Sequence, residues 1–200
     1  MKNLILFFLL LISLNLFSQN SEDYKTFIEK IKKDSKTDKA DKTVYHLFND
    51  FYEQGLQSDQ GELSEDISQR IQKLYSDKKA KNLQILTMFL LYQNHITETA
   101  AVGKQPDPNF QINLIKDLES ELKNTYGSVP IIINIYKAEA LNSAGATKES
   151  AEIISNSLIQ YPNSVPLKVY KYLDTKDEKI KKDLVDNHTN HWMVKQFGIK

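Results

Sequence analysis

Apolar residues recur at intervals of three and four along most of the chain, which places them on one face of a helix with charged residues opposite. The clearest stripes are Tyr24, Phe27, Ile28 and Ile31; Val44, Leu47, Phe48, Phe51 and Tyr52; Ile67, Ile71 and Leu74; and Ile112, Ile115, Leu118 and Leu122. Residues 85–92 are apolar almost all round and show no alternation, which favours a buried central helix over a buried strand. We therefore predict an all-α protein of about eight helices in antiparallel pairs.

Glycine, proline and short polar residues mark the expected helix ends. Glycines follow three of the apolar stripes, as is usual just past a helix C-terminus: Gly55, Gly127 and Gly145. The sequence GKQPDPNF, residues 103–110, is the clearest loop. We expect Asp107 to cap the next helix, with Pro108 at its first position, and Thr147 to cap the helix after Gly145.

One short pattern occurs twice. The chain reads GSVPIIINIYK at residues 127–137 and NSVPLKVYKYL at residues 163–173, and HTNHWMVKQF from His188 is a fainter echo. A serine followed by a proline suits a helix start, because serine can cap and proline needs no hydrogen bond in the first turn. A repeated start indicates a repeated structural unit, since one helix pair cannot bury its apolar face alone.

Residues 128–162 carry the pattern of one such unit most completely. Small and apolar residues and the two breakers occupy the expected places: Ala138, Leu141, Gly145, Ile154 and Pro162. The unit resembles the tetratricopeptide repeat, although Asn134 and Lys137 depart from its aromatic and leucine positions and two serines replace alanines. The resemblance is fainter in 79–126 and 164–188. It implies a tetratricopeptide-like α-solenoid in the C-terminal half, and a protein or peptide ligand in the groove of the first helices, at Ile132, Ile135, Glu139 and Asn142.

The first residues have the layout of a secretory signal peptide. Lys2 precedes an apolar run at residues 4–12, and a small residue, Ser18, precedes the expected cleavage point. The run is too short to span a membrane, so we expect no stable membrane insertion after cleavage. The sequence contains no cysteine, which excludes disulfides and a lipid-anchored cysteine. We expect a periplasmic or secreted protein with a single helical domain at 19–200, divided into N-terminal helices (19–78) and repeats (79–200).

Composition narrows the classes of partner. Without Lys2 the mature chain has almost equal numbers of cations and acids, and Arg70 is its only arginine. It therefore lacks the positive field and the guanidinium groups that nucleic-acid binding uses, and we expect no nucleic-acid partner. The last residues contain the single tryptophan. We expect Trp192, Val194 and Phe197 to form a structural cap on the last repeat, with a partner-binding role for Trp192 as the alternative.

No catalytic motif or cofactor-binding loop is present, and we predict no metal site and no cofactor. His188 and His191 could share a helical face, and Asp186 is near, but a metal site needs more ligands in position and the pair straddles an expected turn, so we interpret both histidines as turn and capping residues. The sequence therefore predicts a non-catalytic interaction module of a bacterial cell envelope that binds an unknown protein or peptide. The alternative is a small-molecule-binding helical protein or hydrolase with an aromatic pocket at Tyr45–Tyr52.

Overall fold

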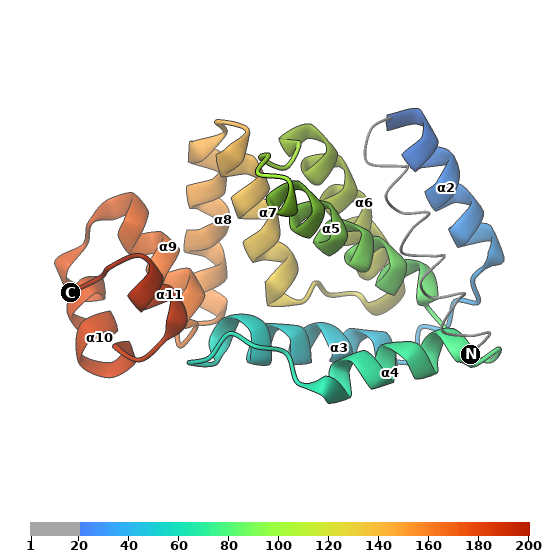
Figure 1. Cartoon of the computed structure of the whole chain (residues 1–200), viewed down its shortest axis with the longest axis horizontal. Helices are drawn as coiled ribbons and strands as arrows, with labels where there is room; N and C mark the ends of the chain where they lie inside the picture. The colour runs from blue at the N-terminus through green and yellow to red at the C-terminus, as the bar shows by residue number, and fades with distance from the viewer. Residues whose placement is uncertain (1–20) are drawn as a thin grey trace. The chain divides into compact units, whose positions relative to one another are not determined.

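The computed structural model describes residues 21–200, and in this range it has α-helices, one π-helical segment and no strand (Figure 1). The all-α prediction is confirmed. The signal-peptide prediction for residues 1–18 lies outside the described residues. The helices are α2 (Ser21–Asp34), α3 (Thr43–Phe51), η1 (Tyr52–Gln57), α4 (Glu65–Ser76), α5 (Leu83–Ala101), α6 (Pro108–Tyr126), α7 (Ile131–Ser143), α8 (Thr147–Gln160), α9 (Val165–Thr175), α10 (Glu178–His188) and α11 (Trp192–Gln196).

The chain divides into two compact units. The first comprises Met1–Val44 and Ser68–Val129, and the second comprises Tyr45–Ile67 and Pro130–Lys200. The divisions fall within α3, within α4 and just before α7. No helix in residues 21–200 has the length and apolar character needed to cross a membrane.

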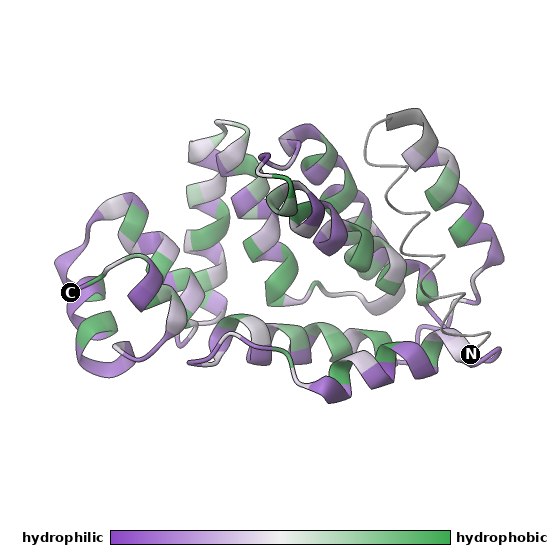
Figure 2. Cartoon of the chain, in the orientation of Figure 1, coloured by the Kyte–Doolittle hydropathy of each residue, from purple (hydrophilic) through white to green (hydrophobic). Residues whose placement is uncertain are grey.

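In the first unit, α5 packs against α2 and α6. Residues 85–92 lie inside α5 and are buried except for Leu90, so the expectation of a buried helix here is confirmed. Two polar contacts join α2 to α6: the Tyr24 hydroxyl donates to Asp117 at 3.0 Å, and Lys32 pairs with Glu121 at 2.7 Å. Figure 2 shows green and purple bands alternating along α2 and α4, the pattern of amphipathic helices.

A buried asparagine anchors the charged connector between α2 and α3. Asn82 is fully buried, precedes α5 and adopts a left-handed conformation with φ of 60°. Its side-chain amide donates to the carbonyl oxygens of Asp38 and Asp41 at 2.8 and 3.1 Å, and its carbonyl oxygen accepts from the backbone of Asp38 at 2.9 Å. One side chain thus satisfies the backbone of a segment that has no regular secondary structure.

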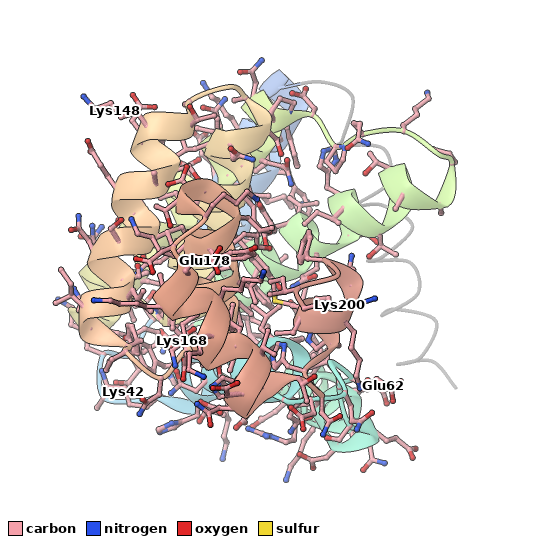
Figure 3. All side chains as sticks on the ribbon, turned by 90° about the vertical axis from the view of Figure 1, so that its left-hand side faces the viewer. Lys42, Glu62, Lys148, Lys168, Glu178 and Lys200 are labelled. Atoms are coloured by element: carbon pink, nitrogen blue, oxygen red, sulfur yellow. The ribbon has the colours of Figure 1, made fainter. Side chains whose placement is uncertain are left out.

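In the second unit, α7 packs against α8, α8 against α9, and α9 against α10 and α11. A separate apolar core forms among the last three helices. Its buried members are Val165, Val169, Leu184, Met193, Val194 and Ile199. Charged residues of this unit such as Lys148 and Glu62 point away from the ribbon (Figure 3).

The prediction that a helix ends at Gly55 is wrong, because the chain continues through it as the π-helical segment η1. This segment holds the start of α9 through Gln57. The Gln57 side-chain oxygen accepts from the backbone of Val165 at 3.0 Å and from the Tyr52 hydroxyl at 2.8 Å, and its amide donates to the carbonyl of Asn163 at 3.3 Å. Tertiary hydrogen bonds therefore favour the wider turn over termination.

Of the four residues predicted to cap a helix, two do so and two do not. Asp107 caps α6 by accepting from two backbone N–H groups, and Ser164 caps α9 by accepting from Leu167 at 3.3 Å, as expected. Ser128 does not cap α7, whose N-cap residue is Pro130, and Thr147 does not cap α8, whose N-cap residue is Ala146. Each of these two residues lies one or two positions from the place where its hydroxyl would reach the free N–H groups.

Candidate functional site

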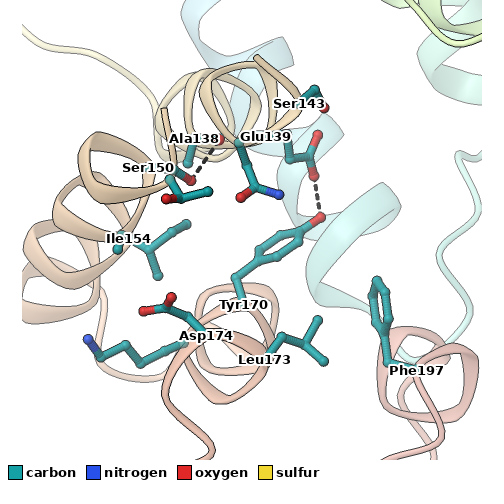
Figure 4. Close-up of a pocket in the computed structure, with 13 residues that line it drawn as sticks. Ala138, Glu139, Ser143, Ser150, Ile154, Tyr170, Leu173, Asp174 and Phe197 are labelled. Atoms are coloured by element: carbon teal, nitrogen blue, oxygen red, sulfur yellow. Dashed lines mark hydrogen bonds between the residues drawn. The ribbon is translucent and has the colours of Figure 1, made fainter. Parts of the chain in front are cut away.

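The second unit contains a cavity of about 490 Å³ between α7, α8 and α9 (Figure 4). Phe197, just past α11, forms part of one side. The lining combines apolar, hydroxyl and charged residues: Ala138, Glu139, Asn142, Ser143, Thr147, Ser150, Ala151, Ile154, Tyr170, Lys171, Leu173, Asp174 and Phe197. A volume of this size suits a small ligand or one to two side chains of a bound peptide.

Local sequence sets the positions of the helices that form the cavity. Gly145 makes the turn between α7 and α8 with φ of 82°, a conformation that glycine adopts without strain. Ser150 then donates to the carbonyl of Ala138 at 2.7 Å, and both residues are buried. Small side chains at this point allow α7 and α8 to approach closely, and the hydrogen bond holds their register. The Ser164 cap starts α9 on the other side.

The central polar contact of the cavity joins α7 to α9. The Tyr170 hydroxyl donates a hydrogen bond to Oε1 of Glu139, which Figure 4 shows as a dashed line. Burial of the carboxyl group raises the pKa of Glu139 to about 7, and the hydrogen bond from Tyr170 acts in the opposite direction by favouring the charged form. A carboxyl group with this pKa exchanges its proton near neutral pH.

Lys171 and Asp174, which also line the cavity, bring further charge from α9. Asp174 is exposed. The Lys171 ammonium donates to Ser155 Oγ of α8 at 2.9 Å. Two carboxyl groups therefore line the cavity, and the one cation in the lining has a partner outside it.

The structure separates the four groove residues expected from the sequence. Glu139 and Asn142 line the cavity. Ile132 and Ile135 are buried in the apolar interior and do not line it. All four residues share one face of α7; the part of this face that lines the cavity is its C-terminal part, and the two isoleucines nearer the N-terminus belong to the buried packing.

The residues of the expected cap also lie in different surroundings. Val194 is buried in the core of the last three helices, and Trp192 packs against that core. The Trp192 ring also covers Gly61: a Cβ added there would lie 2.6 Å from the ring. Phe197 is 42% exposed and lines the cavity, so it is placed to meet a ligand as well as its neighbours.

His191 holds the same C-terminal segment through both ring nitrogens. Its Nδ1 accepts from the backbone N–H of Met193 at 3.2 Å, which caps α11, so Nε2 carries the proton and donates to the carbonyl of Leu56 at 2.9 Å. Burial lowers the pKa of this histidine. The interpretation of His191 as a capping residue is confirmed. In residues 21–200 no group of three or more His, Asp or Glu side chains is arranged to hold a metal ion.

The aromatic stripe of the alternative hypothesis lies mostly inside the protein. Phe48, Phe51 and Tyr52 are buried, and burial raises the pKa of Tyr52 to about 12. The cavity described above is formed by other residues.

Sequence reasoning did not select Tyr170, Asp174 or Ser150 as site residues. Tyr170 and Asp174 lie 31 and 35 positions after Glu139, and no local spacing connects them to it. In the sequence, Ser150 stands out only as a departure from the alanine of the tetratricopeptide repeat. No protein-family model, curated protein or solved structure matches the chain.

Proposed function

We propose that the chain is an exported, non-catalytic interaction module of a bacterial cell envelope, and that it binds a short segment of another protein in the cavity between α7, α8 and α9. The observation that carries the proposal is the cavity itself. Apolar side chains and polar groups both line the cavity, and a peptide ligand could use both kinds of contact. The cavity also lies in the region where the sequence repeats.

The tetratricopeptide-like array is part of this proposal. Helix α7 begins after Pro130 and α9 begins after Ser164, so each copy of Ser-Val-Pro lies at the start of a helix, before α7 in the first copy and across the first residues of α9 in the second. In the proposed arrangement α7 with α8 and α9 with α10 are successive antiparallel pairs. The cavity then lies where one pair meets the next, a position at which solenoids commonly bind extended ligands.

Binding at the cavity is tested by selecting ligands from a display library of short random peptides. Ser143 lines the cavity and is exposed, so Ser143→Trp should block it with little effect on folding. Ala144→Trp is the matched control, because Ala144 is exposed and adjacent but outside the lining. Enriched peptides should bind wild type and Ala144→Trp, and bind Ser143→Trp at least about tenfold more weakly. Failure to enrich any peptide, or equal binding to both variants, would contradict the proposal.

Export is tested separately. The mature protein from the native host should begin close to residue 19 and be found outside the cytoplasm, free of the membrane. Mass spectrometry of its N-terminus measures this directly. An intact Met1 on a cytoplasmic protein would exclude a periplasmic or secreted location and leave the binding proposal to be judged on its own test.

A further inference from the structure

We propose that the cavity takes the ammonium group of a lysine side chain of the bound segment, with the Glu139 carboxylate as its ion-pair partner. This inference rests on the proposed function and names the chemistry of its ligand. It follows from the charge of the lining, the geometry of the Glu139–Tyr170 contact and the apolar walls of the cavity.

The charge of the lining favours a cation. Glu139 and Asp174 contribute carboxyl groups, and α8 contributes no charged residue to the lining. Lys171 is the one cation there, and its ammonium donates to Ser155, which lies outside the lining. A ligand anion would meet two carboxyl groups, whereas a ligand cation would find an acceptor that the protein does not neutralise with a positive charge of its own.

The geometry at Glu139 favours an ammonium over a guanidinium. The Tyr170 hydroxyl already occupies Oε1 of the carboxylate. The guanidinium fork of arginine pairs best when both carboxylate oxygens are free to accept in parallel. An ammonium is a compact point charge that needs only one strong acceptor, so it suits a carboxylate with one oxygen already engaged.

The walls fit the rest of a lysine side chain. Ile154, Leu173 and Phe197 line the cavity together with Tyr170, and Figure 4 shows Ile154 and Phe197 on opposite sides of the Tyr170 ring, with Leu173 near its base. A four-carbon stem can lie along apolar surface while its charged end reaches the carboxylate. The exposed ring of Phe197 provides further contact at the side of the cavity.

Ionisation of Glu139 should make the interaction depend on pH. The groups that line the cavity beside it are Tyr170, Lys171 and Asp174 on α9, with none on α8. Burial raises the pKa of Glu139 to about 7, so the free protein holds a partly protonated carboxyl at neutral pH. Only the ionised form attracts an ammonium, so binding should tighten as the pH rises through about 7 and weaken below it.

The simplest probe is n-butylammonium, which reproduces the end of a lysine side chain, with butan-1-ol and butyrate as neutral and anionic counterparts. Each is titrated into purified protein at constant ionic strength, at about pH 8 and about pH 5.5, and amide shifts are followed by NMR. We expect n-butylammonium to produce saturable shifts at Asn142, Ser143, Ile154 and Leu173 at the higher pH. The affinity should fall at least about tenfold at the lower pH, and the counterparts should bind more weakly.

Two variants and a control make the test specific. Glu139→Gln should weaken n-butylammonium binding at least about tenfold at pH 8 and abolish its pH dependence. Tyr170→Phe removes the hydrogen bond that favours the charged carboxylate, so the midpoint of the pH dependence should move upward. Glu149→Gln changes an exposed carboxylate of α8 outside the lining and should leave binding unchanged. Equal binding of butyrate, or unchanged binding by Glu139→Gln, would overturn the proposal.

The outcomes separate this inference from the function on which it rests. Selected peptides that bind at the cavity without needing a lysine would overturn the ammonium proposal and leave the binding module intact. Saturable n-butylammonium binding at Glu139, with no peptide enriched at the cavity, would support the chemistry of the site and overturn the peptide-binding function.

Discussion

Helix α9 contributes to two very different environments. Val165 and Val169 are buried in the apolar core that α9 forms with α10 and α11. Tyr170, Lys171 and Asp174 belong to the same helix and line the cavity beside α7 and α8. Val169 is therefore enclosed in the core, whereas the next residue, Tyr170, packs against that core and also lines the cavity.

The two environments differ in how their polar groups are satisfied. Next to the core, both ring nitrogens of His191 have backbone partners, so its polar atoms are occupied within the protein. In the cavity, the protein supplies the Glu139 carboxylate with a hydroxyl donor but no cation. Incomplete pairing of a partly buried acid is costly for folding, which is why we propose that a ligand cation completes the pairing at Glu139.

The largest expected contrast comes from shortening a core side chain and a cavity side chain. Leu184→Ala leaves a void in the core of α9 to α11, where Leu184 is fully buried. The free energy of unfolding should fall by about 2–5 kcal/mol. Phe197→Ala removes a ring that is 42% exposed and should cost about 1 kcal/mol or less. Urea denaturation followed by circular dichroism measures both, and equal losses would remove the distinction between the two environments.

A glycine substitution tests how tightly residues pack around Trp192, beside the core of α9 to α11. Gly61 and Gly198 both have positive φ, 68° and 60°, so alanine is strained at either position. At Gly61 the added Cβ would also lie 2.6 Å from the Trp192 ring, whereas at Gly198 nothing lies within 4 Å. Gly61→Ala should therefore be less stable than Gly198→Ala by about 1–3 kcal/mol. The fluorescence of Trp192, the single tryptophan, should change in the first variant and not in the second.

Low pH should lower the free energy of unfolding through protonation of His191, which lies beside the core of α9 to α11. Its pKa is lowered in the folded protein, so the unfolded chain takes up the proton first, near its ordinary value of about 6.5. The contribution of His191 to the free energy of unfolding is therefore fully present above about pH 6.5 and is lost as the pH falls below that value. His191→Asn keeps an acceptor at the start of α11 but does not titrate, so it should lose less stability in acid than the wild type. Denaturation curves of wild type and His191→Asn at pH 7.5 and 5.5 measure this difference. The pKa of His95 is also lowered by burial, but His95 is present in both proteins, so its contribution cancels.

The smallest expected effect concerns ion pairs at the surface of the same helices. Lys168 pairs with Asp183 at 2.6 Å with side chains 17% and 36% exposed, while Lys182 pairs with Asp186 at the same distance with side chains 77% and 51% exposed. Lys168→Met should lower the free energy of unfolding by up to about 1 kcal/mol, because water screens this pair less. Lys182→Met should have almost no effect. A larger loss for Lys182→Met would show that exposure does not determine the strength of these pairs.

Some of the site could be inferred from the sequence and some could not. The resemblance of residues 128–162 to a repeat selected Glu139 and Asn142, which line the cavity, and also Ile132 and Ile135, which are buried. The spacing of these four positions places them all on one face of α7, so what separates them is their place along the helix: Ile132 and Ile135 lie nearer its N-terminus, and Glu139 and Asn142 nearer its C-terminus. Which of them remain accessible depends on how α8 and α9 pack, and this packing is not encoded in any local pattern.

The sequence by itself determined the features that depend on neighbours a few positions away. The spacing of apolar residues determined the all-α class, and Asp107, Ser164 and Gly127 determined helix ends. Only the tertiary structure decided where distant segments supply a missing partner. Gly55 stays within a π-helical segment because Gln57 binds the start of α9, and Asn82 adopts a left-handed conformation while its amide binds the connector before α3. Glu139 likewise acquires its raised pKa only when packing buries its carboxyl group, and its hydrogen-bond partner, Tyr170, lies 31 residues away in the sequence. A hydrogen bond or a burial cost of a few kcal/mol can override a local preference of about 1 kcal/mol, and such tertiary interactions exist only after the chain has folded.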